Sequence, residues 1–360
     1  MSIDDVTREG LRHTRPGREA TVTGPKGGPG ADDSLRSLGA DGGRPDGAPG
    51  PRVGRDRTDE EPGSYYGLPV LNQPVWSAPD IPGYFFLGGL AGASSVLGAG
   101  AALTGRPALR RSTDVVAAGA ISLSLVALVH DLGRPGRFLN MLRVLKVTSP
   151  MSVGAWLLAA YSPLAGGAAF TALTGRLRRV GGLASAGAAV LGPAVAAYTG
   201  ALVADTAVPA WHDGHREMPL LFAASGAAAA GGAAMALTPV AEAAPARRLG
   251  ALGSLVEVAT ATAMERRMGP TGEPYHSGRA GTLMRSAKVA GVLGAVGAVT
   301  FGRRSRSASV LSGAALVAAS ALTRFGVFDA GLQSAADPRS TVQPQRERLE
   351  RTTPGRNGST

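Results

Sequence analysis

Long apolar stretches separated by short polar segments run through most of this sequence. Apolar residues occur on all faces of the helices that these stretches would form, which is typical of segments in lipid or in a packed bundle. A helix needs about 20 such residues to cross the roughly 30 Å hydrocarbon core of a membrane. Eight stretches qualify as such spans: 81–104, 113–131, 151–174, 181–204, 218–237, 249–268, 282–302 and 307–326.

These stretches predict an all-α integral membrane protein, a bundle of eight transmembrane helices. Gly, Ala and Ser recur within them, as in LGGLAGASSVLGAGAA, and small residues let membrane helices approach closely. Glu257, Arg285 and Lys288 interrupt the sixth and seventh stretches, which are therefore the least regular. The alternative is a soluble all-α protein with buried, alanine-rich helices, but eight consecutive stretches of this length favour the membrane bundle.

Residues 1–62 and 335–360 have a different composition, rich in Gly, Pro and charged residues and without apolar periodicity. Such segments bury too little apolar surface to offset the entropy of the chain. We therefore predict a disordered N-terminal tail over 1–62, a membrane domain over 63–330 and a disordered C-terminal tail over 331–360. The first residues, MSIDDVTREG, lack the apolar centre of a signal peptide.

The net charge of +11 comes largely from arginines beside the apolar stretches, so it does not predict a nucleic-acid partner. Short loops rich in Lys and Arg usually face the cytoplasm. The segments after the first, third, fifth and seventh stretches hold a single acid, Glu242, and these arginines: Arg106, Arg110, Arg111, Arg176, Arg178, Arg179, Arg247, Arg248, Arg303, Arg304 and Arg306. We therefore expect these segments on the cytoplasmic side of a bacterial plasma membrane and both termini outside it.

The sequence contains no cysteine, which excludes thiolate zinc sites and cysteine-ligated iron–sulfur clusters in this chain. Of its histidines, only His130 lies in or beside a long apolar stretch. A haem in a membrane bundle needs an axial histidine on a helix, so we expect no haem here. His212 and His215 alone do not predict a metal site. Any redox metals would belong to partner proteins.

Polar residues cluster at the end of the second apolar stretch, in LVHDLGRPGRFLNMLRVLKVTSPMSVGAW. His130 and Asp131 end the stretch, and ionisable residues in a membrane are costly and therefore candidates for function. Four polar residues then recur at a spacing of three, which predicts one face of a short helix at the membrane surface: Arg134, Arg137, Asn140 and Arg143. The arginines would bind lipid phosphate or dock a soluble partner, and Asp131 would pair with one of them or act in a site.

A second cluster, YTGALVADTAVPAWHDGHREMP, begins inside the fourth stretch. Tyr198 needs a partner for its hydroxyl at that depth, or it is an ordinary interfacial tyrosine. Asp205 follows two turns later on the same helix face, and Trp211 lies in the polar segment beyond. Glu257 is a third candidate, near the middle of the sixth stretch, where a proton path and a structural hydrogen bond are both open.

Four of these segments together resemble the NrfD/PsrC family, the polysulfide-reductase-type membrane subunits of molybdoenzyme complexes. They are YYGLPVLNQPVW, IPGYFFLGGLAGAS, LVHDLGRPGRFLNMLRVLKVTSPMSVGAW and YTGALVADTAVPAW, and the resemblance covers about residues 62–330. It implies a haem-free, cluster-free eight-helix anchor that binds a quinone, menaquinone or ubiquinone. The implied partners are a four-cluster, ferredoxin-like iron–sulfur subunit and a molybdopterin catalytic subunit, in a complex like formate dehydrogenase or like a polysulfide or sulfur reductase.

The resemblance also implies roles for individual residues. Tyr198 looks like a quinone-contacting residue, and Asp131 looks like a proton-handling or quinone-pocket residue. Quinone oxygens need hydrogen-bond donors and a source of protons. We therefore expect His130 and Arg134 beside the quinone as well, and we expect the following further roles: a proton relay through Asp131, Asp205 and Glu257, and partner docking by Arg137, Asn140 and Trp211.

A transporter or proton-translocating subunit is the alternative function, with Glu257, Asp205 and Asp131 as its charge path. Transporters tend to show repeated halves with broken helices. The sequence shows no convincing repeat between residues 81–204 and 218–326, which favours the quinone-binding anchor.

Overall fold

The structure, a computed structural model, describes these residues: 71, 74, 76–133, 136–337 and 340. They belong to one compact unit that spans residues 60–360. The predicted N-terminal tail lies outside the described residues, and so does most of the predicted C-terminal tail.

The described part of the chain is helical and contains no strand. Its elements, in chain order, are α2 (Asp80–Leu103), α3 (Pro107–Asp131), α4 (Gly136–Met141), α5 (Pro150–Thr174), α6 (Arg178–Ala204), α7 (Pro209–His212), α8 (Met218–Leu237), α9 (Ala244–Met268), the 3-10 helix η2 (Gly269–Tyr275), α10 (Gly278–Thr300) and α11 (Arg306–Ala336).

Within the described residues, 7 helices are long and apolar enough to cross a membrane: α2, α3, α5, α6, α8, α10 and α11. The remaining long helix, α9, coincides with the sixth predicted stretch but carries charged residues at both ends and Glu257 in its interior. The chain is thus a multi-pass helical membrane protein. A transmembrane position for α9, and with it the count of eight, stays a prediction.

Helix ends follow the local sequence. At the start of α5 the hydroxyl of Ser149 accepts a hydrogen bond from the N–H of Ser152 at 3.4 Å, and Pro150 takes the first helical position, which needs no N–H donor. Gly175 ends the same helix with a φ of 69°, a left-handed conformation that favours glycine. Ser305 caps α11 in the same way as Ser149 caps α5, by accepting from the N–H of Ala308 at 3.3 Å.

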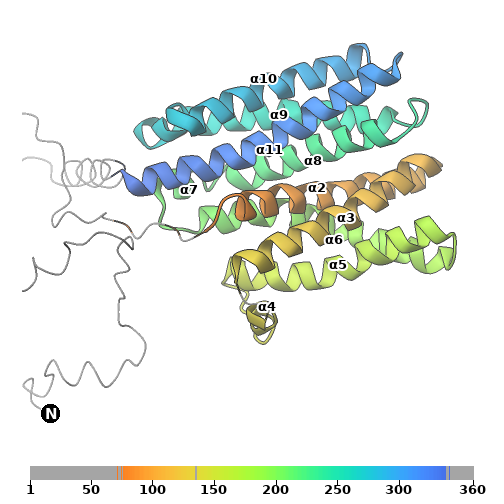
Figure 1. The fold of residues 1–360 in the computed structure, drawn as a ribbon, viewed down its shortest axis with the longest axis horizontal. Coiled ribbons are helices and arrows are strands. Elements are labelled where there is room, and N and C mark those ends of the chain that lie inside the picture. The colour runs from red at the N-terminus through yellow and green to blue at the C-terminus, as the bar shows by residue number, and fades with distance from the viewer. Residues whose placement is uncertain (1–70, 72–73, 75, 134–135, 338–339, 341–360) are drawn as a thin grey trace, which may run out of the picture. The chain divides into compact units, whose positions relative to one another are not determined.

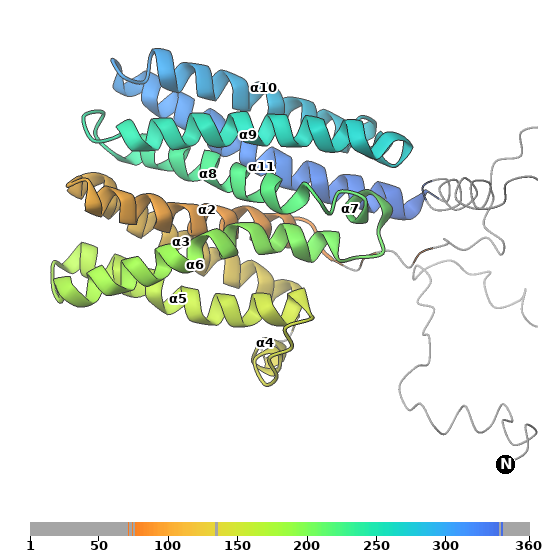
Figure 2. The same ribbon diagram turned by 180° about the vertical axis from the view of Figure 1, so that it is seen from behind.

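The long helices form two groups of four that lie side by side, as Figure 1 and the reverse view in Figure 2 show. We call α2, α3, α5 and α6 the first half and α8, α9, α10 and α11 the second half. Helix α2 lies at the seam, because it packs against α3 and α6 in its own half and against α8 and α11 in the other.

Small residues produce the closest helix contacts, as predicted from the sequence. A methyl group added at Gly92 of α2 or at Gly192 of α6 would overlap the carbonyl oxygen of the other glycine. At the seam, a methyl group added at Gly226 of α8 would lie 2.7 Å from the carbonyl oxygen of Gly89 on α2. Backbones pack directly at these points, which is how membrane helices gain contact without a hydrophobic drive.

Several arginines that the sequence placed in loops lie instead in helices, because α3, α6, α9 and α11 begin earlier than predicted: Arg110, Arg111, Arg178, Arg179, Arg247, Arg248 and Arg306. Long arginine side chains can reach water from a helix end, so a helix need not stop where the arginines begin. The arginine-rich segments still gather at one end of the bundle, which we call the basic end. The opposite end carries α4, α7 and η2.

The prediction for the last span was wrong about its end. Helix α11 continues to Ala336, past the expected end at 326 and past the expected domain boundary at 330. Residues 331–336 are therefore helical and do not belong to a disordered tail. Helix α11 packs against α7 and η2, and the hydroxyl of the buried Ser334 accepts a hydrogen bond from the N–H of Ala210 on α7 at 3.3 Å.

Candidate functional site

A pocket of about 100 Å³ lies in the first half, at the end opposite the basic end. All four long helices of the half contribute to it, together with the segment before α2. Aromatic and aliphatic side chains form most of its wall, and its polar groups include the Asp131 carboxyl and the Tyr198 hydroxyl. The lining residues are Trp76, Ile81, Tyr84, Phe85, Leu128, Asp131, Leu132, Met141, Met151, Gly154, Ala155, Leu158, Tyr198 and Leu202.

Tyr198 of α6 reaches this pocket because α5 carries glycine opposite it. A methyl group at Gly154 would lie 2.9 Å from Cδ2 of the Tyr198 ring, so a larger residue would displace the ring. The ring also meets that of Tyr84 edge to face, with centroids 6.4 Å apart. The Tyr198 hydroxyl is buried and has no hydrogen-bond partner among the residues that the structure describes. It is therefore available to a ligand.

Asp131, at the end of α3, is held by the segment before α2. Its Oδ1 accepts a hydrogen bond from the N–H of Ser77 at 3.0 Å and one from the Ser77 hydroxyl at 2.8 Å. The same hydroxyl lies 2.9 Å from Oδ2 of Asp80. A serine hydroxyl has one hydrogen, so it donates to one of the two carboxylates at a time unless one of them is protonated.

His130 extends this polar group to the surface. Its Nδ1 lies 2.8 Å from Oδ2 of Asp80, and its side chain is 77% exposed. His130, Asp80, Ser77 and Asp131 thus form a continuous series of hydrogen-bonding groups that begins in water and ends in the pocket. His130 does not line the pocket itself.

Trp211 of α7 is fully buried, with 0% of its side chain exposed. Its ring stacks on that of Trp76 at 5.4 Å, and its Nε1 donates to the carbonyl of Val327 on α11 at 2.7 Å. The ring occupies the space that a side chain at Gly331 would fill. A partner protein cannot reach this ring, so the expected docking role of Trp211 does not fit the structure. It supports the pocket wall from behind, through Trp76.

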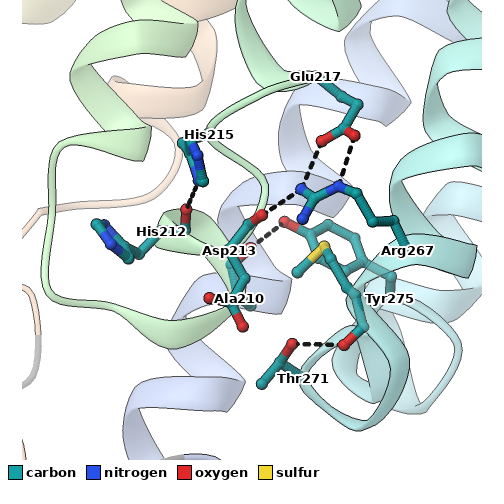
Figure 3. A network of polar contacts seen from close by, with 9 residues as sticks. Ala210, His212, Asp213, His215, Glu217, Arg267, Thr271 and Tyr275 are labelled. Atoms are coloured by element: carbon teal, nitrogen blue, oxygen red, sulfur yellow. Dashed lines mark hydrogen bonds and ion pairs between the residues drawn. The ribbon is translucent and has the colours of Figure 1, made fainter.

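A polar network fixes the segment around α7, as Figure 3 shows. The Arg267 guanidinium of α9 donates to both carboxylate oxygens of Glu217 at 2.6 Å and also to the carbonyl of Asp213. This ion pair holds the pKa of the Glu217 carboxyl below its usual value. The hydroxyl of Tyr275 donates to the carbonyl of Ala210 at 3.0 Å, and burial raises its pKa. The network anchors α7, and with it Trp211, to the second half.

The two histidines of this segment lie together, with ring centroids 5.9 Å apart. Nδ1 of His215 lies 2.9 Å from the carbonyl oxygen of His212, as Figure 3 also shows. Among the described residues, no group of three or more histidines and acids is arranged to hold a metal ion.

The other predicted site residues are not gathered at the pocket. Arg134 lies outside the described residues. Arg137 and Asn140 are exposed on α4, which has no buried residue. Asp205 follows the last residue of α6, is exposed and does not line the pocket that contains Tyr198. Glu257 is buried in the second half.

Three polar residues of interest were missed in the sequence. Ser77 and Asp80 lie 50 or more residues before His130 and Asp131, and only the fold brings them together. Arg324 is buried in α11, within the last predicted stretch. The rule that selected Glu257, an ionisable residue inside an apolar stretch, would also have found Arg324.

A larger pocket lies elsewhere, an apolar groove of about 720 Å³ between α9 and α10. Its wall holds none of the residues predicted for the site. The smaller pocket is the candidate ligand site, because it combines an apolar wall with convergent polar groups.

A family model described as polysulphide reductase, NrfD, matches residues 69–249, which is half of the chain. The chain belongs to the NrfD family. The match covers every residue of the pocket and the Ser77–Asp80 segment, and it ends within α9 of this NrfD protein. Proteins of the NrfD family are generally membrane subunits of redox complexes. No curated protein matches the chain closely enough to count as a relative.

Proposed function

We propose that this NrfD protein is the quinone-binding membrane anchor of a molybdopterin oxidoreductase complex. In this role it passes electrons between a four-cluster, ferredoxin-like iron–sulfur subunit and the quinone pool of the plasma membrane. The observation that carries the proposal is the pocket in which Tyr198 has a buried, unpartnered hydroxyl beside Asp131. The catalytic partner would resemble formate dehydrogenase or a polysulfide or sulfur reductase.

The residues of the pocket fit a quinone. Trp76, Tyr84 and Phe85 give it aromatic walls, and Tyr198 gives it a free donor. The volume of about 100 Å³ is well below the roughly 300–1,000 Å³ that is usual for a whole drug-sized ligand. It therefore suits one ring, with an isoprenoid tail outside it along the apolar helix faces. A quinone, menaquinone or ubiquinone, supplies two-electron, two-proton redox chemistry when bound.

The protein contributes hydrogen bonding and protons. Tyr198 donates from its hydroxyl, which makes no competing bond among the described residues. Asp131 holds or releases a proton at its carboxylate. His130 exchanges protons with water, and the Asp80 carboxylate and the Ser77 hydroxyl connect it to Asp131 through contacts of 2.8 and 2.9 Å. General acid–base groups of this kind contribute about 10²–10⁴-fold to a rate.

The exposed surface of α4 suits the docking of a partner subunit. Arg137 and Asn140 are exposed on α4 at the same end of the bundle as the pocket, where a soluble iron–sulfur subunit would have to dock for electron transfer. The basic end would face the cytoplasm, and lipid phosphate would contact its arginines. The pocket, the partner and both termini would then be outside.

The first test compares two buried tyrosines. Tyr198→Phe should weaken the binding of a quinone analogue by up to about tenfold, because one neutral hydrogen bond is lost, and should leave stability unchanged. Tyr161→Phe is the matched control, since the Tyr161 hydroxyl donates to the carbonyl of Ala91 at 2.7 Å, away from the pocket. It should lower stability by about 1 kcal/mol and leave affinity unchanged. Equal affinity in wild type and Tyr198→Phe would contradict the proposed site.

The second test concerns the proton route. Asp131→Asn keeps the shape of the pocket but removes the group that holds the proton. In membranes that contain the native complex, quinone-coupled turnover should fall by about 10²-fold or more while the complex remains assembled. Normal turnover in this variant would rule out Asp131 as the proton donor. Purification from native membranes without an iron–sulfur partner and without quinone would reject the function as a whole.

A further inference from the structure

Among the charged side chains of the second half that the proposed function does not use, two are buried without a direct ion pair to an opposite charge in the described part of the chain. Glu257 of α9 is 4% exposed, and Arg324 of α11 is 0% exposed. Both lie in the interior of long helices rather than at their ends. Ionisable groups at such depth are costly in a membrane protein and are retained where they have a function. Both residues also lie beyond the segment that the family model matches.

Arg324 is fixed by helix α8. Its Nη2 donates to the carbonyl oxygen of Phe222 at 2.6 Å, and its guanidinium carbon lies 3.8 Å from the centroid of the Phe222 ring. Glycine at position 89 of α2 leaves room for the same nitrogen. Its Nε and Nη1 have no hydrogen-bond partner within the described part of the chain. The cation is therefore held rigidly at the seam, and two of its nitrogens remain free.

Glu257 is held differently, since neither of its carboxylate oxygens has a hydrogen-bond partner among the described residues. The guanidinium of Arg324 on α11 interacts electrostatically with the Glu257 carboxyl. The two groups do not form a direct ion pair within 4.0 Å. Lys288 of α10 does not compete, because its Nζ is bound to Glu265 at 2.5 Å.

Hydroxyl groups surround the Glu257 carboxyl. Ser225 of α8 and Thr323 of α11 face it, and the Ser225 hydroxyl donates to that of Ser320 at 2.8 Å. One turn earlier on α9, the buried hydroxyl of Ser254 has no partner in the described residues. A hydroxyl can both donate and accept, so it can bond to a carboxylate and to a neutral carboxylic acid. This environment accommodates both protonation states of Glu257.

We propose that Glu257 and Arg324 form a buried proton-binding site in the second half, separate from the pocket, in which the Glu257 carboxyl exchanges a proton and the Arg324 guanidinium balances its ionised form. Ionised Glu257 must keep a buried carboxylate that makes no direct ion pair among the described residues, and neutral Glu257 leaves Arg324 without a counter-charge; both are unfavourable in the interior. The ionised and the neutral state of Glu257 are thus each unfavourable for a different reason, and neither is strongly preferred. The proton on Glu257 is therefore exchangeable rather than permanently bound or permanently absent.

Infrared difference spectroscopy of the full-length chain in lipid nanodiscs tests this site directly. Acid-minus-base spectra should contain the carbonyl stretch of a protonated carboxylic acid that disappears as the pH rises. Labelling the glutamates with ¹³C should shift this band, which separates glutamate from aspartate. The labelled wild-type spectrum decides the matter even if a variant fails to fold, because the absence of any titrating glutamate band would overturn the proposal.

Variants assign the band. Glu257→Gln should abolish it, and Glu265→Gln, which removes the buried acid that Lys288 already pairs, should retain it. Arg324→Gln removes the counter-charge, so the band should persist over the whole pH range. A band that survives in Glu257→Gln would overturn the site, and an unchanged titration in Arg324→Gln would overturn the role of the arginine. These outcomes do not depend on a bound quinone and are distinct from failure of the proposed function.

Discussion

Asp131 in the first half of the bundle and Glu257 in the second half are held in different ways. In the first half, Asp131 accepts hydrogen bonds from the backbone and the hydroxyl of Ser77, and Asp80 connects it to the exposed His130. In the second half, Glu257 is buried and has no hydrogen-bond partner among the described residues. The first arrangement gives an acid continuous contact with water. The second separates an acid from water and places a cation near it, so that the protonation of the Glu257 carboxyl depends on the Arg324 guanidinium.

This difference separates two tasks that one bundle can perform. A series of hydrogen-bonded groups that ends in water can deliver protons to a pocket at the membrane surface. An isolated acid in the interior can store a proton without immediate loss to water. Both sites lie close to α2, because Phe85 lines the pocket and its ring lies 5.9 Å from that of Phe222, on which Arg324 stacks.

The largest expected effect comes from removing one of the aromatic contacts between the halves. Trp211 packs on Trp76, which precedes the first half, and on Phe328 of the second, with ring centroids 5.4 and 6.0 Å away. Trp211→Ala should lower the free energy of unfolding by about 3–5 kcal/mol, because a buried ring is replaced by a cavity and a hydrogen bond is lost. Unfolding in detergent followed by circular dichroism measures this.

Trp156→Ala is the matched control, since Trp156 of α5 is 41% exposed on the outer face of the bundle. It should change the stability by about 0.5 kcal/mol or less. Equal losses in the two variants would show that Trp211 does not join the halves. A loss in Trp211→Ala that is confined to quinone binding would instead assign it to the pocket alone.

The bundle itself could be predicted from the sequence because the apolar stretches are long and follow one another closely. The end of α11 could not, because the tail-like composition begins at residue 335 and the residues just before it carry no signal for where the helix ends. Residues 331–336 are helical through contacts with α7 and η2, which are far away in the sequence. The starts of α3, α6 and α9 were misplaced for a related reason. A run of arginines predicts a loop, but an arginine side chain can also reach water from the end of a helix.

A smaller effect is expected from filling the space beside Tyr198. In Gly154→Ala the new methyl group would collide with the Tyr198 ring, which must move. Overpacking of this kind costs about 1–3 kcal/mol, and the displaced ring should also weaken binding of a quinone analogue. The infrared band of Glu257 should not change, because that residue lies in the other half.

Gly166→Ala on the same helix provides the control. A methyl group there meets nothing within 4 Å, so stability should be unchanged or slightly increased by the higher helix propensity of alanine. If Gly154→Ala alters the Glu257 band as well, the two sites are coupled rather than independent. If it alters neither quinone binding nor stability, Tyr198 is not held as described.

The site was predictable to the extent that its residues lie in contiguous motifs. Tyr198 and Asp131 stand in segments that resemble a known family, and the pocket brings these two together. Ser77 and Asp80 carry no local signal, since their role depends on the start of α2 folding against the end of α3. Trp211 looked like an exposed loop residue because its neighbours are polar, and its burial depends on Gly331 of α11.

The smallest expected effect concerns Glu217, which forms an ion pair with Arg267 near the surface. Its environment differs from those of Asp131 and Glu257. Arg267 holds the pKa of Glu217 below its usual value of 4.5, so the pair stabilises the fold above that pH and loses its effect as the pH falls further. Partly exposed pairs contribute at most about 1 kcal/mol. Wild type should therefore exceed Glu217→Gln in stability by about that amount at neutral pH, and the difference should vanish in acid and shrink in high salt. Glu273→Gln, at an exposed acid of η2, should show no such pH-dependent difference. A difference for Glu217→Gln that persists in acid would mean that its side chain acts through packing rather than charge.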